Sequence, residues 1–118
     1  MKVLITTKSK FFYEALKFIL YRDVKKFNLA KSFEEFKEMV KRNEYDLILC
    51  DFDCMQDNAE DVIELLRDLS SYTPIIVFSF DTTQSIKRKI SKSTLTNLIS
   101  RPLNPLEVLK AVKRIKES

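Results

Sequence analysis

Short runs of apolar residues alternate along the chain with longer segments whose apolar residues recur at helical spacing. The apolar runs, each of a length typical of a buried strand, are residues 2–7, 27–31, 46–51, 74–79 and 96–100. The segments with helical spacing are residues 10–22, a stretch starting at residue 32, and residues 59–69, 81–92 and 105–116. Regular alternation predicts a single α/β domain over residues 1–118, with a parallel sheet covered by helices on both faces.

Polar residues at the expected helix starts support these bounds. Ser32 and Glu35 have the spacing of a capping box, in which each side chain reaches a backbone amide of the first turn. Asn58 is placed to cap the next helix. Asn104 is placed to cap the last one, and Pro105 suits its first turn.

The composition excludes several kinds of site. The chain contains no glycine, so neither the dinucleotide-binding fingerprint nor the P-loop can exist in it. Its two cysteines, Cys50 and Cys54, occur without any histidine, which is too few ligands for a zinc site. We expect two reduced thiols, Cys50 in a buried strand and Cys54 in the loop that follows it.

Hydropathy and charge set further expectations. No apolar run approaches the ~18 residues of a membrane span, and the N-terminal run suits a first strand better than a signal peptide, so a cytoplasmic location is expected. The net charge of +4 is unevenly placed, because residues 82–118 hold nine Lys or Arg against two acids. This basic third of the chain indicates either an acidic partner or simple solvation.

Short segments that contain polar or charged residues lie at the ends of four of the predicted strands. They are Thr7-Lys8, Asp51-Phe52-Asp53, Ser79 and Arg101-Pro102. In a parallel α/β sheet, ligands bind beyond the carboxyl ends of the strands, where the strand order reverses. We therefore expect these residues to form the functional site.

In these strand-end residues the chain resembles the receiver domains of two-component response regulators. The resemblance covers essentially the whole chain and is carried by residues 45–51 (YDLILCD), residues 73–79 (TPIIVFS) and the Arg101-Pro102 pair. It implies a three-layer α/β/α sandwich of the flavodoxin-like (βα)5 type, with strand order 2-1-3-4-5. It also implies a signalling module in two-component phosphorelays, and not an enzyme.

The resemblance assigns expected roles to particular residues. Asp51 matches the aspartate that accepts the phosphoryl group, as a carboxylate nucleophile can. Ser79 matches the hydroxyl residue that contacts the phosphoryl oxygens, and Arg101 stands in place of the family's lysine. Pro102 matches the proline that follows this lysine. The backbone carbonyl of Asp53 matches a carbonyl that binds the metal.

Thr7 and Lys8 occupy the positions of the acidic pair that normally holds Mg²⁺ in this family. Because Mg²⁺ requires hard oxygen ligands, usually anchored by carboxylates, we expect no cofactor, weak or absent Mg²⁺ binding, and impaired phosphorylation of Asp51. The alternative is a weak metal site on Asp51 and Asp53, with Asp53 supplying part of the missing acidity; otherwise Asp53 is a solvated loop acid. Lys8 either replaces the metal cation beside Asp51 or points to solvent.

The resemblance also implies an output surface and partners. The family's output and dimer face is formed by the fourth helix, the fifth strand and the fifth helix. On this chain it carries Lys87, Arg88, Lys89, Lys92, Leu98, Lys110, Lys113, Arg114 and Lys116. Leu98 stands where the family usually has Tyr or Phe. We expect a signalling protein as partner, either a histidine kinase or an output protein, and a homodimer through this face is possible; a plain solvated surface is the alternative.

Three other functions remain open. The first is a working phosphoacceptor at Asp51, since Ser79 and Arg101 are in place. The second is nucleic-acid binding through the basic face, which is disfavoured because no aromatic residues interleave with the cations and no helix-turn-helix follows. The third is a flavin or nucleotide site at residues 6–10, which the absence of glycine and tryptophan disfavours.

Overall fold

A five-stranded parallel sheet forms the centre of the molecule. The computed structural model describes residues 1–80, 88, 96–101 and 103–117. The strands are β1 (Lys2–Thr6), β2 (Lys26–Ala30), β3 (Leu47–Asp51), β4 (Ile75–Ser79) and β5 (Thr96–Ser100). Their spatial order is β2-β1-β3-β4-β5, which confirms the predicted topology. This order reverses between β1 and β3, so the carboxyl ends of these two strands flank the expected ligand position.

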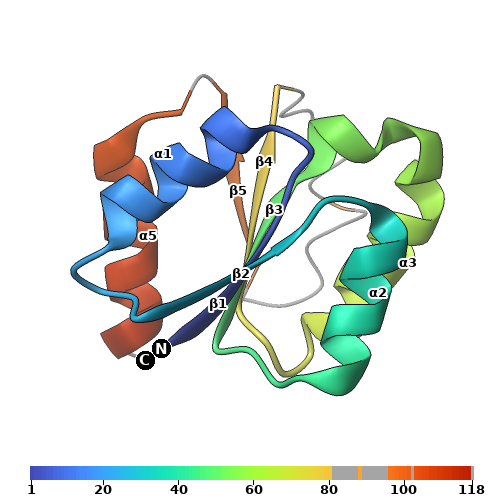
Figure 1. The fold of residues 1–118 in the computed structure, drawn as a ribbon, viewed down its shortest axis with the longest axis horizontal. Coiled ribbons are helices and arrows are strands. Elements are labelled where there is room, and N and C mark those ends of the chain that lie inside the picture. Colours follow the sequence, from blue (N-terminus) through green and yellow to red (C-terminus); the bar gives the residue numbers. More distant parts are fainter. Residues whose placement is uncertain (81–87, 89–95, 102, 118) are drawn as a thin grey trace.

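Helices cover both faces of the sheet (Figure 1). The described helices are α1 (Lys10–Leu20), α2 (Phe33–Arg42), the 3₁₀ helix η1 (Phe52–Asn58), α3 (Ala59–Leu69) and α5 (Pro105–Glu117). In Figure 1, α1 and α5 lie on one side of the sheet and α2 and α3 on the other. The predicted helix over residues 81–92, apart from Arg88, and Pro102 lie outside the described residues. No described helix is long and apolar enough to cross a membrane.

Local capping explains where the helices begin. The Ser32 hydroxyl accepts a hydrogen bond from the Glu35 amide at 3.1 Å, as the capping box predicts. The Asn104 side chain likewise accepts from the Leu106 amide at 3.0 Å at the start of α5. Ser9, which the sequence prediction did not single out, caps α1 by accepting from the Phe12 amide at 3.2 Å.

The segment after β3 differs from the prediction. Residues expected to form an open loop are folded as η1, which leads directly into α3. The predicted cap at Asn58 is wrong, because its side chain makes no capping hydrogen bond. A cap is less necessary here since the chain enters α3 from a helical turn, and the Ala59 amide already donates to the Gln56 carbonyl. η1 therefore fixes the position of the residues that follow Asp51.

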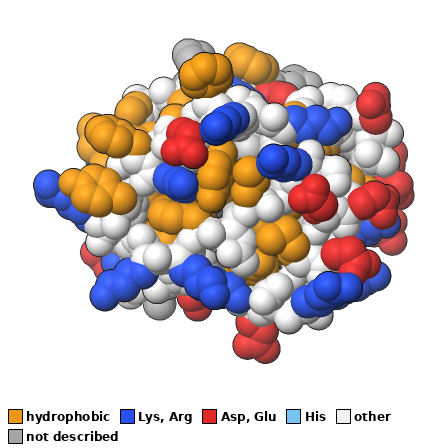
Figure 2. Space-filling model, in the orientation of Figure 1, with side chains coloured by type: hydrophobic (Ala, Val, Ile, Leu, Met, Phe, Trp, Pro, Cys, Tyr) orange, Lys and Arg blue, Asp and Glu red, His pale blue; other side chains and the backbone are white. Residues whose placement is uncertain are grey.

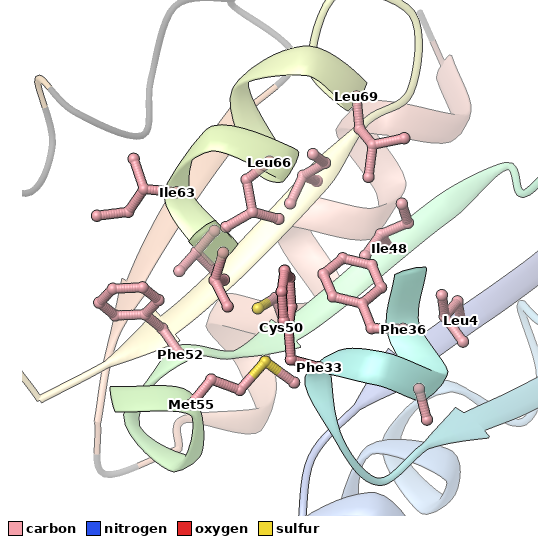
Figure 3. Close-up of a cluster of buried hydrophobic side chains, with 14 of the residues drawn as sticks. Leu4, Phe33, Phe36, Ile48, Cys50, Phe52, Met55, Ile63, Leu66 and Leu69 are labelled. Atoms are coloured by element: carbon pink, nitrogen blue, oxygen red, sulfur yellow. The ribbon is translucent and has the colours of Figure 1, made fainter. Parts of the chain in front are cut away.

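Two apolar clusters, one on each face of the sheet, hold these elements together. Every residue of β3 and β4 is buried, as expected for central strands covered on both sides. Figure 3 shows the cluster under α2 and α3, where Phe36 and Leu66 meet side chains of β3. Phe52 and Met55 of η1 point into the same cluster and are almost fully buried. On the other face, Phe12 of α1 packs edge-to-face on Phe78 with ring centroids 5.2 Å apart.

Candidate functional site

Buried polar side chains gather at the carboxyl ends of the strands. Thr7 follows β1, Asp51 ends β3 and Ser79 ends β4, and each is at most 2% exposed. Arg101 follows β5, and its amide donates to the Ser79 carbonyl at 3.2 Å, which continues the pairing of β4 with β5. The structure thus brings together Thr7, Asp51, Ser79 and Arg101, one residue from each of the four predicted strand ends.

The Asp51 carboxylate contacts two partners, one at each oxygen. The Thr7 hydroxyl donates to Oδ2 at 2.6 Å, and the Arg101 guanidinium Nη1 donates to Oδ1 at 2.6 Å. The Asp51 side chain is 3% exposed and that of Arg101 is 17% exposed, so this ion pair is shielded from water. A buried carboxylate is costly unless it is paired and hydrogen-bonded, and both conditions are met here.

The Arg101 guanidinium is held between two aromatic rings as well as by acids. Its central carbon lies 4.4 Å from the centroid of the Phe12 ring and 5.0 Å from that of Phe80. These distances suit cation–π contacts, which contribute about 0.5–2 kcal/mol each depending on desolvation. The planar guanidinium stacks on aromatic faces in a way that a lysine ammonium does not. The arrangement fixes Arg101 beside Asp51.

The Asp53 carboxylate is a second acceptor at the site. The Ser79 hydroxyl donates to its Oδ1 at 3.1 Å, and the Phe80 amide donates to its Oδ2 at 3.0 Å. Arg101 Nη1 lies 3.5 Å from the same Oδ2. Asp53 belongs to η1 and its side chain is 24% exposed. It is therefore a site residue and not a solvated loop acid.

Lys8 does not lie beside Asp51 in place of a metal cation, which was one of the two predicted alternatives. Its side chain is exposed, and in the described part of the chain the ion pair of Asp51 is with Arg101. The hypothesis that Asp51 pairs with Lys8 is therefore wrong. The preceding residue, Thr7, is buried instead, and its Oγ1 also accepts from the Ser9 amide at 3.1 Å. This second bond orients the Thr7 hydroxyl toward Asp51.

The donor set of the site does not match what Mg²⁺ requires. Mg²⁺ needs a nearly octahedral shell of hard oxygens, usually anchored by carboxylates. The two carboxylates of this site, Asp51 and Asp53, both contact Arg101. Among the described residues, no group of three or more His, Cys, Asp or Glu side chains could hold a metal ion. A guanidinium within hydrogen-bonding distance of Asp51 makes the site a poor fit for a divalent cation, because like charges repel.

Both cysteines are free thiols, as predicted, and both adjoin the site. Cys50 lies in β3 and is fully buried, while Cys54 lies in η1 and donates to the Asp51 carbonyl at 3.2 Å. Burial raises the pKa of the Cys50 thiol well above its usual value. Burial, and then the Asp51 charge, also raise the pKa of Cys54. Both thiols are therefore protonated at neutral pH.

The predicted output face is only partly within the described residues. Lys87, Lys89 and Lys92 lie outside them. The described basic residues of this face are exposed, namely Arg88, Lys110, Lys113, Arg114 and Lys116. Leu98 is partly buried and packs against the cluster under α2 and α3. Lys116 is 3.5 Å from Asp23, so one of these cations already has an acidic neighbour within the chain.

An exposed apolar surface on α1 was not predicted. Phe11 is 91% exposed and Phe18 is 78% exposed, and they flank a groove of about 740 Å³ that Leu103 and Pro105 also line. Figure 2 shows hydrophobic side chains gathered on the α1 side of the molecule. The signal was available in the sequence, because Phe11 and Phe18 are seven residues apart and lie off the buried stripe that includes Phe12.

Known proteins of one family share this architecture. The chain spans 97% of the chemotaxis response regulator CheY4 of Vibrio cholerae, which covers 97% of this chain with 21% identity and a TM-score of 0.79. A two-component response regulator from Clostridium difficile matches 99% of this chain and 96% of its own, with 25% identity and a TM-score of 0.81. A response regulator from Thermotoga maritima matches 99% and 98%, with 22% identity and a TM-score of 0.81.

The family assignment itself comes from the sequence. A search of curated proteins finds no match to this chain. The sequence model of the response regulator receiver domain matches residues 3–113, which is nearly the whole chain. With the confirmed strand order and the convergence of Asp51, Ser79 and Arg101 at one edge of the sheet, the chain belongs to the receiver domain family of two-component signal transduction.

Proposed function

We propose that this receiver domain signals mainly through protein–protein contacts, with impaired Mg²⁺-dependent phosphorylation of Asp51. The observation that carries the proposal is the direct contact between Arg101 and Asp51 at 2.6 Å. It places a permanent cation against the carboxylate that would otherwise accept a phosphoryl group. The site residues support a fixed internal arrangement more than a metal-dependent switch.

Both oxygens of Asp51 are occupied by partners within the chain. Thr7 donates to one oxygen and Arg101 to the other. To attack a phosphoryl donor, the carboxylate must use a lone pair of an oxygen that already accepts a short hydrogen bond, and this bond lowers the nucleophilicity of that oxygen. Hydrogen bonds between ionised groups are short and roughly twice as strong as neutral ones, which opposes this step.

The residues at the positions of the family's acidic pair also favour impaired phosphorylation. Thr7 supplies a neutral hydroxyl where the family has an acid, and Lys8 is a cation. Phosphoryl transfer depends on cations that neutralise the charge developing on the transferred group and on their anchoring by the protein. Arg101 supplies positive charge, but the described residues provide no group of three or more His, Cys, Asp or Glu side chains that could anchor a metal ion. Slow or absent phosphorylation follows.

The partner is proposed to be a signalling protein, either a histidine kinase or an output protein. The exposed cations of α5, among them Lys110 and Lys113, suit an acidic surface on such a partner. Dimerisation through the predicted output face, which includes residues of β5 and α5, is proposed as the alternative use of this surface.

Incubation with acetyl phosphate and Mg²⁺ tests the proposal. Intact mass spectrometry of the wild-type domain is expected to show no phosphoryl adduct, with Asp51→Asn as the matched blank. A Thr7→Asp, Arg101→Lys double variant restores an acid and the shorter cation, and it is expected to gain an adduct that disappears when Asp51→Asn is added. Lys8→Ala, at an exposed position outside the Asp51 ion pair, serves as the control for a general charge effect.

A working phosphoacceptor is the second candidate. The observation in its favour is the convergence of Asp51, Ser79 and Arg101 within one site. A wild-type adduct as abundant as that of the double variant, and absent from Asp51→Asn, would establish this function and overturn the first.

A further inference from the structure

Donors at the carboxyl ends of β4 and β5 already hold an anion that belongs to the chain. We infer that the Asp53 carboxylate occupies the place of a phosphoryl group and acts as a built-in substitute for it. The inference rests on the proposed function, because it explains how the site stays ordered without phosphorylation. It also gives Asp53 a defined role as a positioning residue for the end of β4.

Three donors from two segments converge on the Asp53 carboxylate. The Ser79 hydroxyl and the Phe80 amide lie at the carboxyl end of β4, 3.1 and 3.0 Å from Oδ1 and Oδ2. The Arg101 guanidinium follows β5 and lies 3.5 Å from Oδ2. One hydroxyl, one backbone amide and one cation form a set of donors suited to the oxygens of a tetrahedral oxyanion.

One of these donors, Arg101, also contacts Asp51. Arg101 Nη1 contacts Asp51 at 2.6 Å and reaches Asp53 from the same nitrogen. By the family correspondence, Ser79 and Arg101 are the residues that contact phosphoryl oxygens. A phosphoryl group on Asp51 would therefore need the donors that Asp53 already uses. It would have to displace the Asp53 carboxylate, and the two negative charges would repel each other.

The fold keeps Asp53 in this position. η1 begins immediately after Asp51, and its residues Phe52 and Met55 are each 2% exposed. Figure 3 shows both side chains directed into the apolar cluster under α2 and α3. The buried Phe52 and Met55 fix the turn on either side of Asp53, so its carboxylate meets β4 without a large loss of conformational freedom on each encounter. A permanent internal anion at the end of β4 follows.

The test is a titration with inorganic phosphate in the presence of EDTA, followed through the backbone amide signals of the ¹⁵N-labelled domain. Asp53→Ala removes the internal anion and leaves the donors. Its Phe80 amide signal is expected to move saturably with phosphate, at an affinity at least about tenfold above that of the wild type, because one negative charge beside the ligand is gone. Adding Ser79→Ala is expected to weaken this binding again.

Asp57→Ala is the matched control, because Asp57 lies in the same η1 segment and is exposed. It is expected to behave as the wild type. Asp53→Asn keeps the shape of the side chain and gives the same comparison if Asp53→Ala does not fold. Phosphate binding no tighter in the folded Asp53 variant than in the wild type overturns the inference.

The outcome is separable from that of the proposed function. Inorganic phosphate cannot phosphorylate Asp51 here, so the titration reports only on the donors around Asp53. A wild-type adduct with acetyl phosphate would instead overturn the proposed function and leave the titration result standing.

Discussion

The Asp51 site and the outer face of α1 depart from the usual distribution of residues in opposite directions. At the site, a charged side chain is buried, with 3% exposure, but both of its oxygens have partners within the chain. On α1, the large apolar side chains of Phe11 and Phe18 are exposed, and the described residues do not cover them. The polar groups of the site are satisfied within the chain, whereas the apolar side chains on α1 are left exposed.

Substitutions in the two regions should therefore affect different properties: the stability of the fold at the Asp51 site, and the binding properties of the surface on α1. Breaking one bond of a buried, satisfied network leaves a polar group without a partner and lowers the free energy of unfolding strongly. Changing an exposed apolar residue alters little in the folded chain and acts on what the surface can bind. The predictions below measure the two regions against each other.

The largest effect is expected from Arg101→Met. This variant leaves the buried Asp51 carboxylate without its cation, and the free energy of unfolding is expected to fall by about 3–5 kcal/mol. Urea denaturation followed by circular dichroism measures the change. Arg42→Ala, which breaks an exposed pair with Glu38, is the control and should cost at most about 0.5 kcal/mol.

A double variant sharpens this result. Asp51→Asn removes the charge that Arg101 compensates, so Asp51→Asn with Arg101→Met is expected to be more stable than Arg101→Met alone. Equal stability of the two variants would show that the Arg101–Asp51 contact is not what stabilises the site.

A smaller effect is expected from Thr7→Val. The isosteric methyl cannot donate to Asp51 or accept from the Ser9 amide, and the loss should be about 1–3 kcal/mol. Thr7→Ser keeps the hydroxyl and is the matched control. If both variants lose the same stability, the effect comes from packing of the methyl group and not from the hydrogen bond.

Alkaline pH is expected to weaken the fold through the thiols. Burial raises the pKa of Cys50 above its unfolded value of about 8.5, so the folded state favours the protonated thiol. The resulting stability is fully present below the unfolded pKa and is lost as the pH rises through the folded pKa. Between these two values the slope approaches about 1.4 kcal/mol per pH unit for each such thiol. The free energy of unfolding, measured by urea denaturation at increasing pH, should fall less steeply for Cys50→Ala than for the wild type. An equal slope for both proteins would contradict the assignment.

The smallest effect on stability is expected on α1. A Phe11→Ser, Phe18→Ser variant should unfold within about 0.5 kcal/mol of the wild type, while Phe12→Ala, one position away but buried, should cost about 3–5 kcal/mol. Binding of a hydrophobic fluorescent dye should fall in the double serine variant. A large loss of stability there would show that this face is covered in the folded protein.

The sequence predicted the sheet well because each central strand is a continuous apolar run. β3 and β4 are buried throughout, and the Ser32 cap follows directly from local spacing. The gathering of Asp51, Ser79 and Arg101 could also be predicted, because parallel strands bring their carboxyl ends to one edge.

The partners within the site could not be predicted in the same way. Lys8 follows Thr7 directly, yet it lies in a bend beyond the end of β1, and its side chain faces solvent. Arg101 reaches Asp51 from 50 residues away, and only the packed fold sets that distance. The contacts of Asp53 depend on η1. This helix could not be predicted, because residues 52–58 contain no glycine or proline that would indicate a turn.

Arginine at position 101 is specified by more than its charge. A lysine could pair with Asp51, but it would present no flat face to the rings of Phe12 and Phe80, which lie 4.4 and 5.0 Å from the guanidinium carbon. The three residues come from α1, from the end of β4 and from the end of β5. Receivers in which an arginine takes this place should therefore carry a diagnostic triplet in their sequences. An arginine after the fifth strand should co-occur with an aromatic residue in the first turn of the first helix and another directly after the hydroxyl that ends the fourth strand.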